Sequence, residues 1–156
     1  MKTELILVGK TVSKEFGKLI DDYSERIGHY MSFSITTLPE LKNTKSLSEE
    51  QQKKAEGELI LKQLQPSDTV VLLDEHGHEP RSIELAQWLE QKRSAARRLV
   101  FVIGGAYGFS EAVYKRANEK IALSKLTFSH QMVRTIFLEQ LYRACTIIKG
   151  EPYHHE

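Results

Sequence analysis

Short apolar runs alternate with helical patterns along the chain, and this alternation limits the fold more than any other feature of the sequence. The runs occupy residues 5–8, 32–38, 69–73, 99–103 and 121–123. Each run is followed by apolar residues at helical spacing or by a residue suited to begin a helix. Successive strand–helix units predict an α/β fold with a mostly parallel sheet that carries helices on both faces.

The expected helices follow from the spacing of apolar residues and from capping residues. Ser48 and Gln51, for example, have the spacing of a capping box. In chain order we expect helices over about 12–27, from Ser48 to about Gln65, from Ser82 onward, from Ser110 to about Lys120, and from Ser129 or His130 to Gly150. A chain of 156 residues forms one domain, residues 1–156, and is too short for a separate substrate-recognition domain.

The charge of the chain is nearly balanced, with 22 lysines and arginines against 21 aspartates and glutamates. Overall charge therefore provides no general attraction to nucleic acid. The second half is nevertheless the more basic one, with two clusters: Lys92, Arg93, Arg97 and Arg98, and then Lys115, Arg116 and Lys120. These clusters fit either a solvated helix face or contacts with phosphate groups.

Three further features bear on where the protein acts. The single cysteine, Cys145, falls among apolar helical positions and is expected to be a core residue. No apolar run approaches the ~20 residues that a membrane span needs. The chain begins directly with a strand pattern, without the apolar region of a signal peptide. We therefore expect a cytoplasmic protein without a membrane partner.

The strand predicted at Leu99–Ile103 ends at two glycines, Gly104 and Gly105, which mark a candidate binding site. Because glycine has no Cβ atom, a ligand can approach its main chain closely. In parallel α/β proteins, ligand sites lie beyond the carboxyl ends of the strands. We expect three stretches to meet at that edge of the sheet: residues 74–77, 104–108 and 124–129.

A pocket built from such loops recognises its ligand through main-chain N–H and C=O groups. These groups suit a neutral heterocycle such as adenine, whose ring would lie between apolar side chains, here Leu73, Leu123, Leu126 and Phe128. The same side chains also suit an ordinary core at strand ends. Periodicity alone does not decide between the two interpretations.

Several known site patterns are absent from the sequence. It contains neither a Walker-type phosphate loop nor a Gly-x-Ser-x-Gly elbow. Its glycine pattern after the fourth strand does not have the spacing of a dinucleotide-binding fold. His76 and His78 are an incomplete set of metal ligands, so we interpret them as polar loop residues and predict no metal site. From position alone, the pair His154 and His155 is typical of a solvated tail.

Several separated motifs occur together in a characteristic order. They are Leu-Val-Gly-Lys at 7–10, Val-Leu-Leu-Asp-Glu-x-Gly at 71–77, Val-Ile-Gly-Gly-Ala-Tyr-Gly at 102–108, Leu-Ser-Lys-Leu-Thr-Phe-Ser-His-Gln-Met-Val-Arg at 123–134, Glu-Gln-Leu-Tyr-Arg-Ala at 139–144 and Gly-Glu-Pro-Tyr-His at 150–154. On these residues the chain resembles the RlmH family over its whole length. One departure is Gly77-His78, where Gly-Lys is expected, so no role for a positive charge is carried over to that position.

The RlmH family belongs to the SPOUT class of S-adenosylmethionine-dependent methyltransferases and methylates N3 of a pseudouridine in 23S ribosomal RNA of the large subunit. The resemblance therefore implies S-adenosylmethionine as cofactor, and the assembled ribosome as substrate. It also implies a C-terminal trefoil knot, a rare exception to unknotted topology, and a homodimer in which each cofactor pocket faces the partner's tail. The implied cofactor-binding residues are Leu73, Gly104, Gly105, Leu123, Ser124, Lys125, Leu126, Thr127 and Phe128.

Methylation of an imide nitrogen requires the nitrogen to lie in line with the methyl group and to lose its proton. His130 is a candidate to take that proton, directly or through water, and its simpler alternative role is a contact at the entry of the last helix. Arg134 is a candidate to stabilise the resulting anion or to bind phosphate.

The remaining catalytic candidates lie near the end of the chain. Arg143 has the same candidate roles as Arg134, and its simpler alternative is an i,i+4 ion pair with Glu139. Tyr153 and His154 are candidates to close the site from the partner subunit, because a helix that ends at Gly150 is expected to send the tail away from its own core.

Two other classes of function fit the same sequence features. A SPOUT methyltransferase with another RNA or a protein as its target would carry the same cofactor loops. A catalytically silent ribosome-binding protein would keep the fold. Cofactor binding distinguishes the silent protein from the enzymes, and mass mapping of methylated ribosomal RNA distinguishes the targets.

Overall fold

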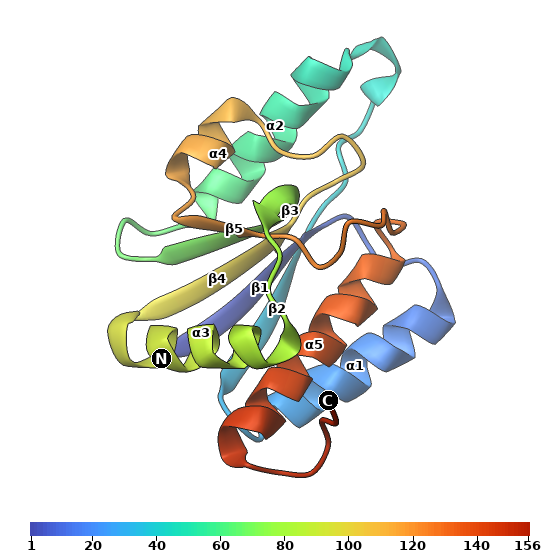
Figure 1. Ribbon diagram of the computed structural model, residues 1–156. Helices are drawn as coiled ribbons and strands as arrows, with labels where there is room; N and C mark the ends of the chain where they lie inside the picture. Colours follow the sequence, from blue (N-terminus) through green and yellow to red (C-terminus); the bar gives the residue numbers. More distant parts are fainter.

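Five strands form a single parallel sheet in the computed structural model, which describes residues 1–156. The strands are β1 (Lys2–Val8), β2 (Ser32–Leu38), β3 (Thr69–His78), β4 (Arg98–Ile103) and β5 (Glu119–Ile121). Their order across the sheet is β2-β1-β4-β3-β5, and all four pairings are parallel (Figure 1). The prediction of a parallel α/β sheet is confirmed.

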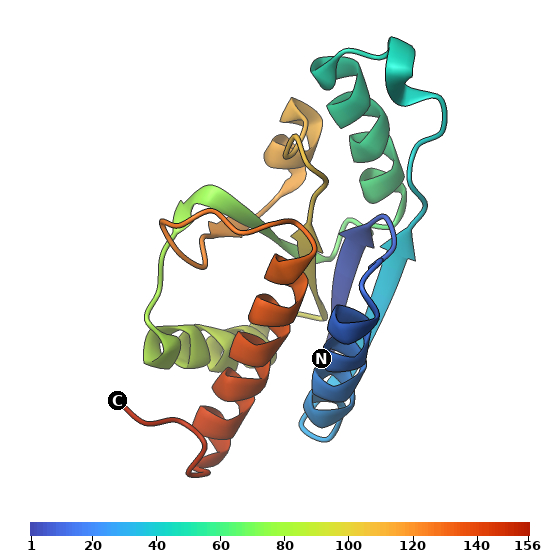
Figure 2. The ribbon, with the colours of Figure 1, turned by 90° about the vertical axis from the view of Figure 1, so that its right-hand side faces the viewer.

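Helices cover both faces of the sheet, as predicted. They are α1 (Lys14–Gly28), α2 (Glu49–Lys62), α3 (Ser82–Ala95), α4 (Glu111–Arg116) and α5 (Met132–Lys149), with a short 3₁₀ turn at Thr44–Ser46. Helices α1, α3 and α5 form one layer, in which α5 contacts both neighbours, and α2 and α4 form the other (Figures 1 and 2).

Alternate residues of the central strands supply the two halves of the core. Leu5 and Leu7 of β1 pack toward α1 and α5, whereas Ile6 and Val8 pack toward α2 and α4. On the first face Phe101 meets Phe137 of α5, with ring centroids 4.9 Å apart. Strands buried on both faces need apolar residues at successive positions, which explains the uninterrupted apolar runs in the sequence.

Several predicted helix caps are present. The N–H of Gln51 donates to Ser48 Oγ (3.1 Å) and the N–H of Ser48 donates to Gln51 Oε1 (2.8 Å), which completes the capping box of α2. Ser110 Oγ accepts the N–H of Val113 at the start of α4. Gly150 ends α5 with a φ of +75°, a left-handed conformation that glycine adopts without strain.

The predicted cap at Ser82 is wrong. Ser82 is the first residue of α3, and its hydroxyl donates to Gln140 Oε1 of α5 at 2.9 Å. The N–H of Arg81 instead donates to Glu84 Oε1 at 2.8 Å. A tertiary contact has thus replaced the local capping role of this serine.

Other predicted boundaries also need correction. α2 ends at Lys62 and α4 at Arg116, earlier than expected, while β5 occupies Glu119–Ile121 rather than residues 121–123. α5 begins at Met132, although Ser129 prepares its first turn by accepting the N–H of Met132 at Oγ (3.1 Å). Helix ends of this kind depend on tertiary packing more than on local sequence.

Strand β3 extends beyond its predicted end at Leu73 and reaches His78, so His76 and His78 belong to a strand rather than to a loop. The strand is irregular, because both Leu73 and His78 pair with Ile121 of β5. Gly77 permits this geometry, since a Cβ atom there would lie 2.6 Å from the main-chain nitrogen of Ile121. Residues 74–77 form the irregular segment between these two pairings.

Candidate functional site

A cavity of about 660 Å³ lies at the carboxyl ends of β3, β4 and β5. Residues of all three predicted stretches line it, those after Leu73 from the irregular end of β3 and the others from the loops that follow β4 and β5, and this volume lies within the usual range for a small-molecule site. Every residue that the resemblance implied for cofactor binding lines this one cavity: Leu73, Gly104, Gly105, Leu123, Ser124, Lys125, Leu126, Thr127 and Phe128.

The main chain of residues 123–128 remains available to a ligand. None of its N–H or C=O groups takes part in a backbone hydrogen bond. One of them, the N–H of Leu126, donates to Ser124 Oγ at 3.0 Å. Unpaired main-chain donors and acceptors beside apolar side chains are suited to a neutral heterocycle.

The glycine turn after β4 packs closely against the protein's own side chains. A Cβ atom at Gly104 would lie 2.9 Å from Cε1 of Phe109, and one at Gly105 would lie 2.7 Å from Oε1 of Glu56. Gly108 has a φ of +83°, and its N–H donates to the carbonyl of Gly105 at 3.2 Å. Internal packing against Phe109 thus favours glycine at position 104, and turn geometry favours it at position 108, in addition to any close approach of a ligand.

His130 lines the same cavity, in the turn that precedes α5. The buried carboxyl of Glu56 lies behind the glycine turn. Burial raises the pKa of Glu56, a hydrogen bond from Gln52 lowers it, and the charges of Glu40 and His130 act in opposite directions. The cavity thus has an exposed imidazole in its lining, and the sequence analysis did not identify the buried carboxyl that packs behind the glycine turn.

Other lining residues were also missed. Lys53 of α2, Tyr107 of the glycine turn and Tyr114 of α4 contribute to the cavity. Tyr114 lies on the helix capped by Ser110, directly after the glycine loop. This position in the sequence could have indicated that Tyr114 lines the cavity. Lys53 offered no such signal, because it reaches the site only through the packing of α2 beside α4.

Arg143, Tyr153 and His154 form a separate group at the other end of α5. Arg143 pairs with Glu139 (Nη2–Oε1 2.6 Å), as its simpler alternative predicted, and also contacts His154 Nδ1 at 3.1 Å. Tyr153 donates to Glu139 Oε1 at 2.9 Å and packs its ring against Tyr142. Burial and the hydrogen bond to Glu139 raise the pKa of Tyr153.

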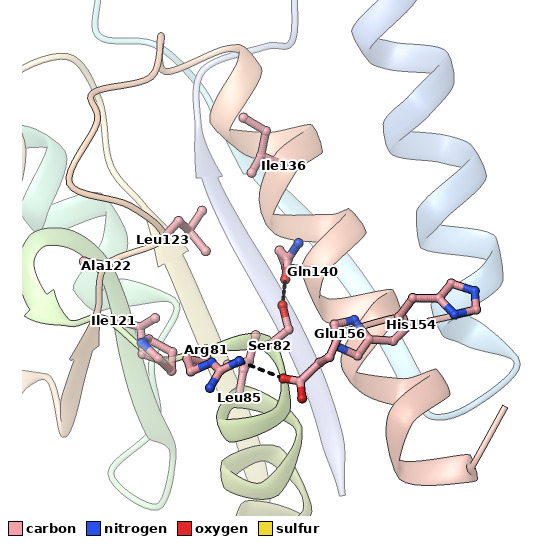
Figure 3. A pocket seen from close by; sticks show the side chains of 12 residues that line it. Arg81, Ser82, Leu85, Ile121, Ala122, Leu123, Ile136, Gln140, His154 and Glu156 are labelled. Carbon is pink, nitrogen blue, oxygen red and sulfur yellow. Dashed lines mark hydrogen bonds and ion pairs between the residues drawn. The ribbon is translucent and has the colours of Figure 1, made fainter. Parts of the chain in front are cut away.

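The tail continues across α5 toward α3 and borders a second cavity of about 470 Å³ (Figure 3). Its last residue, Glu156, pairs with Arg81 at 3.1 Å. Ile121, Ala122 and Leu123 line both cavities, so this short segment separates them. The expectation that the tail turns away from its own core is wrong, because side-chain contacts with α5 and α3 hold it in place.

These positions divide the catalytic candidates into two groups. His130 precedes α5, whereas Arg143 lies roughly 16 Å along the axis of that helix from its first residue, Met132, at 1.5 Å per residue. Neither Arg143, Tyr153 nor His154 lines the larger cavity. Within one chain, therefore, the cavity has His130 but lacks the other three candidates.

The predicted role of Arg134 in binding an anion or phosphate is wrong. Its side chain is fully buried and donates to the carbonyls of Val8 and Gly9 and to the hydroxyl of Thr11, at 2.8–2.9 Å. These contacts attach α5 to the end of β1. The guanidinium of Arg134, buried and bound to main-chain carbonyls, therefore has a structural role.

Two residues of the basic clusters form ion pairs within the chain. Lys92 pairs with Glu119, and Arg98 pairs with Glu4 and Asp68.

No group of three histidine, cysteine or acidic side chains is arranged to hold a metal ion. None of the helices combines the length and apolar character that a membrane crossing requires.

The fold and the cavity define an α/β protein whose small-molecule site is built by loops beyond a parallel sheet. Residues 1–154 match the family described as "Predicted SPOUT methyltransferase". The chain is 62% identical to ribosomal RNA large subunit methyltransferase H of Bacteroides fragilis, with both chains fully covered. The corresponding protein of Christiangramia forsetii is 56% identical over 99% of each chain, and that of Flavobacterium johnsoniae 52% identical over the whole of both. The chain belongs to the SPOUT methyltransferase family.

Proposed function

We propose that this protein transfers a methyl group from S-adenosylmethionine to N3 of a pseudouridine in 23S ribosomal RNA, in the cytoplasm and on the assembled ribosome. The observation that carries the proposal is the full-length identity of 52–62% to proteins named ribosomal RNA large subunit methyltransferase H. The RlmH resemblance of the motifs supports the finer choice of atom and base. The nearly balanced charge of the chain fits a substrate surface that includes ribosomal protein.

The larger cavity supports the choice of cofactor. Leu73, Leu123, Leu126 and Phe128 offer apolar walls, and the free main chain of residues 123–128 offers donors and acceptors to an adenine ring. When bound, S-adenosylmethionine supplies an activated methyl group. No metal belongs to this proposal, so a chelator should leave cofactor binding unchanged.

The chain's own residues must then orient the acceptor nitrogen and remove its proton. His130 is our candidate to accept that proton, and its position in the lining of the larger cavity supports this role. Arg143, with Tyr153 and His154 around it, offers cationic and hydrogen-bonding groups for the anion or for RNA phosphate.

A homodimer would bring the two groups together. The tail is fixed to its own α5 and α3, where it borders the smaller cavity and not the larger one. A second subunit packed against this end of α5 would place one chain's Tyr153 and His154 at the other chain's cavity. The trefoil knot is part of the same proposal, supported by the path of residues 122–131 from β5 across the strand ends to α5 (Figure 1).

Mass mapping of large-subunit ribosomal RNA from a deletion strain tests the function. We expect one methyl group to disappear from a pseudouridine and to return when the gene is restored. Purified protein should also transfer labelled methyl groups to ribosomes from the deletion strain. Unchanged RNA in the deletion strain would contradict the proposed target, whereas failure to bind S-adenosylhomocysteine would favour the silent ribosome-binding protein.

A further inference from the structure

Asp74 is a polar residue of the larger cavity that neither the motifs nor the proposed function assign to a role. It lies directly after Leu73, where β3 becomes irregular. Its Oδ1 atom accepts the main-chain N–H of His76 at 3.1 Å, which holds the carboxylate in a fixed orientation. Its Oδ2 atom is buried and has no hydrogen-bond partner in the protein.

A buried carboxylate oxygen without a donor is costly, so functional sites commonly provide that donor from a ligand. No basic side chain forms an ion pair with Asp74. Tyr114 lines the cavity beside it, but its hydroxyl does not reach Oδ2 in hydrogen-bond geometry. Burial, and then a hydrogen-bonding interaction with the Asp74 side chain, raise the pKa of Tyr114, so its hydroxyl stays neutral and lies near Asp74 without meeting the geometry of a hydrogen bond to Oδ2.

We propose that Oδ2 of Asp74 accepts a hydrogen bond from a ribose hydroxyl of the nucleoside, and that Asp74 thereby selects a ribonucleoside cofactor. This inference rests on the proposed function and names a binding residue within the same site. The ribose is bonded directly to the base, and Asp74 is the chain neighbour of Leu73, one of the apolar walls proposed for that base.

The charged amino-acid end of the cofactor is a poorer match for Oδ2. A flexible charged group favours the solvated mouth of a pocket, and Glu75, whose side chain is 74% exposed, provides a carboxylate there. Oδ2 is buried instead, as expected for an acceptor that serves the neutral hydroxyl of an inserted ring.

Calorimetry with S-adenosylhomocysteine, its 2′-deoxy and 3′-deoxy analogues and 5′-methylthioadenosine tests the proposal, in buffer that contains a chelator. Asp74→Ala should weaken both S-adenosylhomocysteine and 5′-methylthioadenosine by about 10- to 100-fold, the effect of one hydrogen bond to a charged acceptor. At least one deoxy analogue should bind the unaltered protein more weakly by a similar factor, and should lose little more in Asp74→Ala. Glu79→Gln, which removes an exposed charge just after the end of β3, is the control and should bind as the unaltered protein does.

Four results would overturn the proposal. If Asp74→Ala weakens S-adenosylhomocysteine but not 5′-methylthioadenosine, Asp74 binds the amino-acid end. If both deoxy analogues bind the unaltered protein as tightly as S-adenosylhomocysteine, no ribose hydroxyl is recognised; this comparison needs no variant and holds even if Asp74→Ala does not fold. If the unaltered protein binds none of the four probes, the proposed function itself fails. Unchanged binding of both probes by Asp74→Ala would overturn only the role of Asp74.

Discussion

Arg134 has the largest side chain among the fully buried residues, and it forms no ion pair. Burial lowers the pKa of its guanidinium, while the charge of Glu40 opposes this change. We expect Arg134→Met to lower the free energy of unfolding by about 2–4 kcal/mol, because two buried carbonyl groups would lose their donor. Urea denaturation measures this change, with the exposed Arg97→Met as control and an expected effect within about 0.5 kcal/mol. Equal effects of the two variants would contradict a structural role for Arg134.

Gly104 and Gly105 should respond differently to a single added methyl group. At Gly104 the methyl would meet the ring of Phe109, which is buried and packed against Tyr114, so Gly104→Ala should cost about 1–3 kcal/mol. At Gly105 it would meet the carboxylate of Glu56, the end of a flexible side chain, so the cost should be smaller. Thermal unfolding tests this order, and a larger cost at Gly105 would mean that Glu56 is held rigidly.

The corresponding valine variants extend the test to binding. Gly104→Val and Gly105→Val add two further methyl groups each and should weaken S-adenosylhomocysteine binding in calorimetry. Unchanged affinity in a folded variant would mean that the glycines serve only the turn and its internal packing.

At the scale of elements, the junction between α1 and the tail should make stability sensitive to alkaline pH. Tyr30 donates to Glu151 Oε2 at 2.7 Å, and this hydrogen bond, followed by burial, raises the pKa of Tyr30 to about 12. A raised pKa means that the folded state holds the phenolic proton more tightly, so the contribution is complete below the unfolded pKa of about 10. It is lost as pH rises from about 10 through about 12.

Urea denaturation of Tyr30→Phe across that pH range measures the effect. We expect the variant to be less stable than the unaltered protein at neutral pH and to lose less stability between about pH 10 and pH 12. Tyr107→Phe, at an exposed tyrosine without a hydrogen bond, should follow the unaltered protein. An alkaline loss of the same size in Tyr30→Phe would show that other groups cause it.

Sequence patterns predicted those elements that local periodicity and capping determine. Strand β4 ends at Ile103, as its apolar run indicated, and the capping box of α2 begins at Ser48. The extension of β3 was not predictable in this way, because it depends on close contact between Gly77 and Ile121. The burial of Arg134 likewise depends on carbonyl groups of β1 that lie far away in sequence.

The candidate site shows the same division. The segments that we propose to bind the cofactor follow predicted strands, so their meeting at one edge of the sheet was a consequence of parallel topology. The contacts of the tail with Glu139 and Arg81, and the location of Glu56 behind Gly105, arise from tertiary packing alone. No local pattern in the sequence carries that information.

At the scale of the whole molecule, our proposal that two chains share the site rests on the separation of His130 from Arg143 and the tail. Mixing two inactive variants tests this. The first carries Gly104→Val in the cofactor cavity, and the second ends after Gly150, which keeps the cap of α5 but removes Tyr153 and His154. Each variant alone should lack activity, because each of its sites lacks either a working cavity or a tail.

A heterodimer of the two variants has one site that combines the cavity of the truncated chain with the tail of the Gly104→Val chain. We therefore expect the mixture to regain part of the methyl transfer to ribosomes, with at most one working site in each heterodimer. Native mass spectrometry verifies that the subunits exchange. A mixture that exchanges subunits yet stays as inactive as its parents would contradict the shared site, and each chain would then have to complete the site alone by moving its own tail from the smaller cavity to the larger one.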